Sequence, residues 1–239
     1  MMNQVINGIK ARKPKKSSQT MEERANTLRA GVLGSNDGIL TVVGVLFSVA
    51  VATTNQFTIF IAGLSDLLAC AFSMASGEYA SVSTQKDTEE AVVRTEERLL
   101  QTNYDDEVEA VINHYTDRGV TRETAEKIAN NLMAKKPLET VINVKYDLKL
   151  NHYMSPWSAA FSSLFSASAG GIFPLAAMTL SPVAYQWPIT ILAVCASVAL
   201  TGFLSAKLGD GLTKTAMIRN VIVGILTMII HYSVGILLK

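Results

Sequence analysis

The chain has 239 residues, of which 49% are hydrophobic, and its formal net charge at pH 7 is +1. Such a balanced charge does not indicate a nucleic-acid partner, because nucleic-acid binding relies on an excess of Lys and Arg. The two cysteines, Cys70 and Cys195, both lie in apolar segments and do not indicate a disulfide framework.

The charged residues are unevenly distributed along the chain. Fourteen of the twenty acids fall between Lys86 and Lys149, whereas residues 155–206 contain no Asp, Glu, Lys or Arg. A run of this length accommodates two membrane-spanning helices of roughly 20 residues and a turn. The first thirty residues are polar and basic, without the apolar core of a secretory signal peptide. This pattern predicts a multi-pass membrane protein.

In chain order, residues 1–29 form a basic leader that we expect to be disordered up to about Thr20. Five apolar segments follow, each long enough to span a membrane as a helix. They cover residues 30–53, 57–80, 156–180, 189–206 and 220–238.

Between the second and third spans lies a polar insert that we expect to be helical. Four helices are predicted in it: residues 87–100 continuing the second span, from Asp105 to before Gly119, from a Thr121 cap to Lys136, and from Pro137 to 150.

The Lys and Arg residues indicate the orientation of the chain. They gather in the leader, the insert and segment 207–219, whereas the turns at 54–56 and 181–188 contain none. Because Lys and Arg favour the cytoplasmic side, five spans place the N-terminus and the insert in the cytosol and Lys239 on the far side.

We therefore expect three parts. Residues 1–29 are the cytosolic leader, residues 30–81 and 155–239 form the transmembrane domain, and residues 82–154 form a cytosolic helical domain.

Three carboxylates lie inside the apolar segments: Asp37 in the first, and Asp66 and Glu78 in the second. A charge in hydrocarbon costs several kcal/mol, so an intramembrane acid indicates an ion or proton path. Asp66, Cys70, Met74 and Glu78 follow one another at i,i+4 spacing, which places them on one helix face. Carboxylates with a thioether favour a transition metal, and carboxylates can exchange a metal for protons.

Each of these residues also has a structural interpretation. Asp37 can cap a helix, Glu78 can be an interfacial charge, and Met74 alone is more often ordinary packing. The structural interpretation is weakest for Asp66, which lies near mid-membrane.

Other residues in the spans carry weaker signals. Dense small residues, such as Gly34 and Gly38, indicate close helix packing. Pro174 suggests a break in the third span, and His231 is either a proton relay or, as we prefer, a hydrogen-bonded structural histidine. The sequence contains no GxSxG, HExxH or phosphate-binding glycine loop, so we do not predict an enzyme.

Several segments together resemble the signatures of a known transporter family. They are Gly34-Ser-Asn-Asp-Gly38, Ser73-Met-Ala-Ser-Gly-Glu-Tyr-Ala-Ser-Val-Ser-Thr-Gln85, Ser168-Ala-Gly-Gly-Ile-Phe-Pro-Leu175, Thr201-Gly202 and Tyr232xxGly235. Their pattern resembles the vacuolar iron transporter (VIT) family over nearly all of the chain after residue 25. The resemblance implies a dimer of five-span protomers that exchanges Fe²⁺, and often Mn²⁺, for protons. It also implies transport roles for Asp37, Asp66 and Met74.

The resemblance further implies a metal site in the insert, which plant-type members build from Glu residues and a Met pair. Three acids of this chain stand at such positions: Glu96, Glu107 and Asp147. Other ligand positions are occupied here by Leu99, Ala110, Asn143 and Val144, with Glu97 and Glu109 close enough to compensate. The expected outcome is weak metal binding by the insert, and a solvated charged surface is the alternative.

We therefore expect an all-α integral membrane protein with five transmembrane helices and a cytosolic helical insert between the second and third. Its expected function is proton-coupled export of Fe²⁺ or Mn²⁺ from the cytosol by a homodimer without a permanently bound cofactor. Asp37 and Met74 would bind the metal, Asp66 would bind it or carry protons, and Glu78 would admit it. The alternative is a membrane-anchored metal sensor or scaffold acting through the insert. The expected location is the inner membrane in a bacterium, which we favour, or the vacuolar membrane in a eukaryote.

Overall fold

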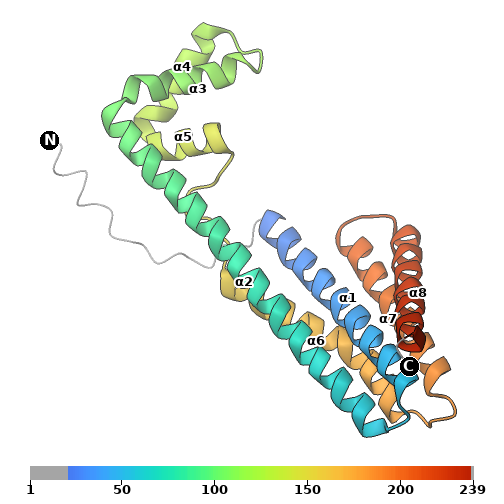
Figure 1. Ribbon diagram of the computed structural model, residues 1–239. Coiled ribbons are helices and arrows are strands. Elements are labelled where there is room, and N and C mark those ends of the chain that lie inside the picture. The colour runs from blue at the N-terminus through green and yellow to red at the C-terminus, as the bar shows by residue number, and fades with distance from the viewer. Residues whose placement is uncertain (1–20, 238–239) are drawn as a thin grey trace.

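The computed structural model describes residues 21–237, and the expected disorder of the leader up to Thr20 lies outside this range. The described chain forms eight α-helices and no strand (Figure 1). They are α1 (Met21–Ala52), α2 (Gln56–Thr102), α3 (Tyr104–Thr116), α4 (Arg122–Lys135), α5 (Pro137–Tyr146), α6 (Pro156–Leu180), α7 (Gln186–Leu208) and α8 (Thr213–Leu237).

Five of these helices, α1, α2, α6, α7 and α8, are long and apolar enough to cross a membrane. Large apolar side chains point outward from them, among them Phe57, Phe165 and Leu192, each about 70% exposed. Such exposure suits a surface that faces lipid rather than water. The expected all-helical fold with five spans is confirmed, and the protein is a multi-pass membrane protein.

Helix α1 occupies the centre of the bundle and contacts each of the other four spans. Its apolar side chains Val42, Val43 and Leu46 are fully buried. They form the main core together with residues from α2, α6, α7 and α8. Asp37 lies on this central helix and is only partly exposed.

The closest approach within the bundle is between α1 and α6, and glycines make it possible. A Cβ added at Gly38 would collide with the carbonyl oxygen of Ala167, and one added at Gly170 would collide with that of Ser35. The predicted close packing through small residues is confirmed.

Pro174 does not break the third span, so that prediction is wrong. Helix α6 continues through Pro174 to Leu180, and the proline ring is buried. Proline is tolerated inside a membrane helix when neighbouring helices support the backbone around it. The backbone of α6 is consequently not opened at this point.

Helix α2 runs without interruption for 47 residues, from the bundle into the insert (Figure 1). It begins at Asn55, whose side chain accepts a hydrogen bond from the Thr58 backbone N–H at 3.1 Å. Its polar half carries i,i+4 pairs of opposite charge, including Lys86 with Glu90 at 3.7 Å. The prediction that the second span continues into the first helix of the insert is confirmed.

Helices α3, α4 and α5 pack on one another and on the polar end of α2, away from the other four spans (Figure 1). Their core contains Val111, Ile112, Ala125, Ala129, Met133 and Val141. The expected stop at Gly119, which has φ +88°, and the expected first-turn position of Pro137 are both confirmed. Helix α5 ends at Tyr146 rather than 150, because Asp147 adopts a left-handed conformation with φ 55°.

Candidate functional site

Asp37 lies in the interior of α1, so it does not cap a helix. Its Oδ2 accepts a hydrogen bond from the Sγ of Cys70 on α2, with a sulfur–oxygen distance of 3.5 Å. Asp37 of α1 therefore meets the face of α2 that carries Asp66, Cys70, Met74 and Glu78, which we call the acidic stripe.

Asp66 lies one helical turn before Cys70 on the same face of α2 and interacts electrostatically with Asp37 and with His231 of α8. Thr41 of α1 lies beside it, but no hydrogen bond of good geometry forms. Asp66 Oδ2 and Thr41 Oγ1 are both buried and unpartnered. Buried polar atoms usually have partners, so two such oxygens together suit a place where a cation or water binds.

Met74 lies one turn after Cys70 and packs with Cys70, Ala71 and Ala167 in a small cluster at the α2–α6 contact. A thioether and a thiol therefore lie in succession along the helix face that contacts Asp37. Sulfur ligands add softness to a carboxylate site. Sequence reasoning placed Cys70 on the stripe but did not select it as a ligand; its i,i+4 spacing was the available signal.

Glu78 lies one turn beyond Met74 and is only partly exposed. Within the described part of the chain it forms no ion pair or side-chain hydrogen bond, and it does not join the Asp37–Cys70 contact. Its neighbour Tyr79 packs against Trp157, at the first turn of α6, with ring centroids 4.9 Å apart. Trp and Tyr favour the boundary between lipid and water, which suits Glu78 to the edge of the membrane.

The ring of His231 lies against Gly44 of α1, where an added Cβ would be 2.7 Å from Nε2. Ser48 Oγ lies 3.4 Å from His231 Nδ1 and donates a hydrogen bond to the His231 carbonyl oxygen at 3.0 Å. This packing agrees with the expected hydrogen-bonded structural histidine.

From residue 21 to 237, no three His, Cys, Asp or Glu side chains converge in the geometry of a metal site. The candidate ligands Asp66, Cys70 and Met74 instead follow one another along α2, where Cys70 contacts Asp37 of α1.

In the insert, the structure brings Glu96 of α2 and Glu107 of α3 together around Lys145 of α5. The Lys145 ammonium lies 2.9 Å from Glu96 and 3.0 Å from Glu107. Tyr146 donates a hydrogen bond from its hydroxyl to Glu96 Oε1 at 2.7 Å. Sequence reasoning missed Lys145 and Tyr146, because it considered only acids and metal ligands.

These contacts raise the pKa values of Lys145 and Tyr146. Partial burial alone would lower the pKa of Lys145, but its hydrogen bonds to Glu96 and Glu107 and their negative charges raise it overall. The hydrogen bond to Glu96, followed by burial, raises the pKa of Tyr146. Lys145 is therefore a firmly held cation at neutral pH.

The other acids proposed for the insert do not join this cluster. Asp147 is exposed at the left-handed turn that ends α5, and Glu97 is exposed on α2. Glu109 accepts two hydrogen bonds from Arg122, at 2.9 and 3.0 Å, on the surface.

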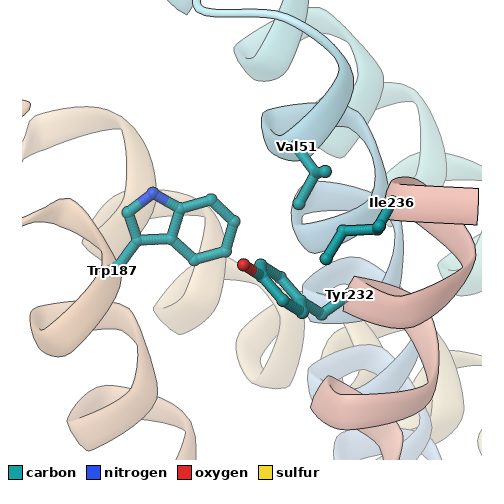
Figure 2. Close-up of a pocket in the computed structure, with 4 residues that line it drawn as sticks. All are labelled: Val51, Trp187, Tyr232 and Ile236. Carbon is teal, nitrogen blue, oxygen red and sulfur yellow. The ribbon is translucent and has the colours of Figure 1, made fainter. Parts of the chain in front are cut away.

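A separate hollow lies between the end of α1, the start of α7 and the end of α8. Figure 2 shows the residues that line it: Val51, Trp187, Tyr232 and Ile236. The rings of Trp187 and Tyr232 meet edge to face, with centroids 5.7 Å apart. None of these four residues is charged, so the hollow adds no ligand to the acidic stripe.

The sequence is similar to that of one family of known proteins. The sequence profile of the VIT family matches residues 28–236. A "Vacuolar iron transporter" from Acanthamoeba castellanii is 34% identical, over 89% of this chain and 79% of that protein. "Vacuolar iron transporter homolog 2" from Oryza sativa subsp. japonica is 30% identical, over 88% of this chain and 90% of that protein. The chain belongs to the VIT family, a family of transporters, and the prediction that it is not an enzyme is confirmed.

Proposed function

We propose that this member of the VIT family exports Fe²⁺, with Mn²⁺ as a second substrate, from the cytosol in exchange for protons. The observation that carries the proposal is the contact between Asp37 and Cys70, with Met74 on one side and the unpaired Asp66 oxygen on the other. The names of the relatives, which call them iron transporters, support iron as the cargo.

The ligand chemistry supports a divalent transition metal. The carboxylates of Asp37 and Asp66 supply hard oxygen donors, and Met74 and Cys70 add softer sulfur donors. Together they suit Fe²⁺ better than Mg²⁺ or Ca²⁺, which prefer oxygen ligands alone. The buried, unpartnered oxygen of Asp66 is a position that a cation would satisfy.

The same groups support exchange with protons. A carboxylate or thiol must lose its proton to bind a metal, and desolvation favours its protonation when the metal leaves. Binding of the ion by Asp37 would replace the hydrogen bond that Cys70 donates to it. Asp66, whose Oδ2 is buried and unpartnered, would carry the returning proton.

We further propose a homodimer, in which a second copy completes the incomplete ligand set of one protomer. Glu78, beside the interfacial Tyr79–Trp157 pair, would admit the ion from the cytosolic side. The division into a leader (1–29), a transmembrane domain (30–81 and 155–239) and a cytosolic domain (82–154) follows the distribution of Lys and Arg. The membrane would be the inner membrane of a bacterium or the vacuolar membrane of a eukaryote.

Metal uptake into proteoliposomes tests the proposal. Asp37→Asn should abolish Fe²⁺ and Mn²⁺ movement, and Met74→Leu, which keeps the volume but removes the sulfur, should slow it. Asp210→Asn is the matched control, because Asp210 lies in the loop between α7 and α8 and its φ of 50° suits Asn equally well. Wild-type rates for Asp37→Asn would refute the site.

The coupling is tested with the membrane potential clamped. Uptake should accelerate when the lumen is acidic and should release protons from it. Metal movement that is indifferent to the pH gradient would indicate a channel, and metal binding without movement would favour the sensor or scaffold.

A further inference from the structure

We propose that Lys145 is a built-in counter-cation that closes the buried Glu96–Glu107 pair to divalent metal ions. The insert would then be held together by the Lys145 ammonium group in place of a metal ion. Loss of Lys145 would leave the two carboxylates free to bind a metal ion. This inference does not depend on the transport function proposed above.

The first observation is the burial of the two acids. Glu96 is 0% exposed and Glu107 is 5% exposed, and they come from different helices, α2 and α3. Two carboxylates brought together away from water require a cation, because unpaired buried charges are strongly unfavourable. The fold of the insert therefore includes a cation at this position, and in this chain that cation is Lys145.

The second observation is that every oxygen of the pair is already engaged. Lys145 Nζ donates to Glu96 Oε2 at 2.9 Å and to the two oxygens of Glu107 at 3.1 and 3.0 Å. The remaining oxygen, Glu96 Oε1, accepts the Tyr146 hydroxyl at 2.7 Å. A metal ion entering here would have to displace both donors.

The third observation is the position of Lys145 at the mouth of the cluster. Its side chain is 27% exposed, whereas those of Glu96 and Glu107 are 0% and 7% exposed. An ion from solvent therefore meets the ammonium group before it meets the carboxylates. The cation is also well placed on its own helix, because it lies in the last turn of α5, where the helix dipole favours positive charge.

Nearby acids do not offset this closure. Asp147 is exposed at the turn that follows, and Glu109 is paired with Arg122 on the surface. With one Lys bound by two Glu, the cluster holds a single uncompensated negative charge. Removing Lys145 would leave two, which matches a divalent cation.

The test is Mn²⁺ binding to the full-length protein in detergent. Free Mn²⁺ is measured by electron paramagnetic resonance. In the wild type and in Lys145→Arg, adding Glu96→Gln should leave the number of bound Mn²⁺ ions unchanged. Lys145→Met should gain a single additional Mn²⁺ site per protomer, and adding Glu96→Gln to it should remove that site. Lys127→Met is the matched control, since Lys127 pairs with Glu123 on the exposed face of α4 and should gain nothing.

The proposal is overturned if wild type binds Mn²⁺ at a site that Glu96→Gln abolishes, or if folded Lys145→Met gains no site. If Lys145→Met unfolds the insert, hydrogen exchange of α3 and α5 in that variant still tests the proposal. If these helices exchange fast without Mn²⁺ and regain protection with it, the proposal is supported. If Mn²⁺ restores no protection, the pair is not a latent metal site.

Discussion

Replacing Gly38 by Ala tests whether the close contact between α1 and α6 positions the acid beside it. The added Cβ would collide with the carbonyl oxygen of Ala167 and lie 2.9 Å from the carbonyl carbon, whereas ordinary van der Waals contact begins at 3.4 Å. The obstacle is backbone, which cannot rotate away as a side chain can. The two helices must therefore separate by about 0.5 Å to relieve the carbon contact alone, and by more for the oxygen.

The energetic cost follows from this geometry. Overpacking a well-packed interior costs about 1–3 kcal/mol, and a backbone obstacle places Gly38→Ala in the upper part of that range. The better helix propensity of Ala returns up to about 1 kcal/mol. We expect a net loss of about 1–2 kcal/mol, which is roughly a 5–30-fold change in the folded-to-unfolded ratio. Displacement of α1 would also lengthen the 3.5 Å contact between Asp37 and Cys70 and slow metal transport.

The assay is equilibrium unfolding in mixed micelles of increasing SDS content, with transport measured on the same preparations. The matched control is Gly77→Ala on α2, because an added Cβ at Gly77 meets no atom within 4 Å. That variant should be as stable as the wild type or slightly more so. Equal unfolding midpoints for Gly38→Ala and Gly77→Ala would refute the reasoning.

Three further outcomes are expected. Cys70→Ala should lower Fe²⁺ transport more than Mn²⁺ transport in proteoliposomes, because it removes a soft donor beside Asp37; an unchanged ratio would count against a ligand role. Asn220→Leu should cost about 0.6–1.7 kcal/mol in the SDS titration by removing the 3.3 Å hydrogen bond to the Val198 carbonyl, and no loss would contradict that contact. In the folded protein the pKa of Lys145 is raised above its ordinary value of 10.5. The stability from its ion pairs is therefore fully present below pH 10.5 and is lost as the pH rises through the higher pKa of the folded protein. The thermal midpoint of the insert by circular dichroism should follow this course, and a Lys145→Met variant should lack this dependence.

The spans and the acids within them were predictable because both depend on local sequence. A run of apolar residues and a carboxylate inside it are visible without knowing any contact. The helix ends were less predictable: α8 begins at Thr213 rather than 220, and α1 begins at Met21 rather than 30. Hydropathy marks where lipid contact begins, and a helix can extend into water beyond that point.

The contacts between helices could not be predicted in the same way. Lys145 lies 49 positions from Glu96 and 38 from Glu107, so only the packing of α5 on α2 and α3 reveals their association. Pro174 was misjudged for a related reason, because its effect depends on the neighbours that bury it and not on the residue alone.

The continuity of α2 has a mechanical consequence. The helix joins Cys70, inside the bundle, to Glu96, in the insert, without a hinge between them. At 1.5 Å per residue its far end at Thr102 lies roughly 48 Å from Cys70, so a tilt of about 5° at mid-membrane moves that end by about 4 Å. The insert therefore acts as the long arm of a lever whose pivot lies beside the acidic stripe. A small tilt of α2 around a passing ion produces a larger displacement at its opposite end. A force applied to the insert is likewise transmitted along α2 to its membrane-spanning part.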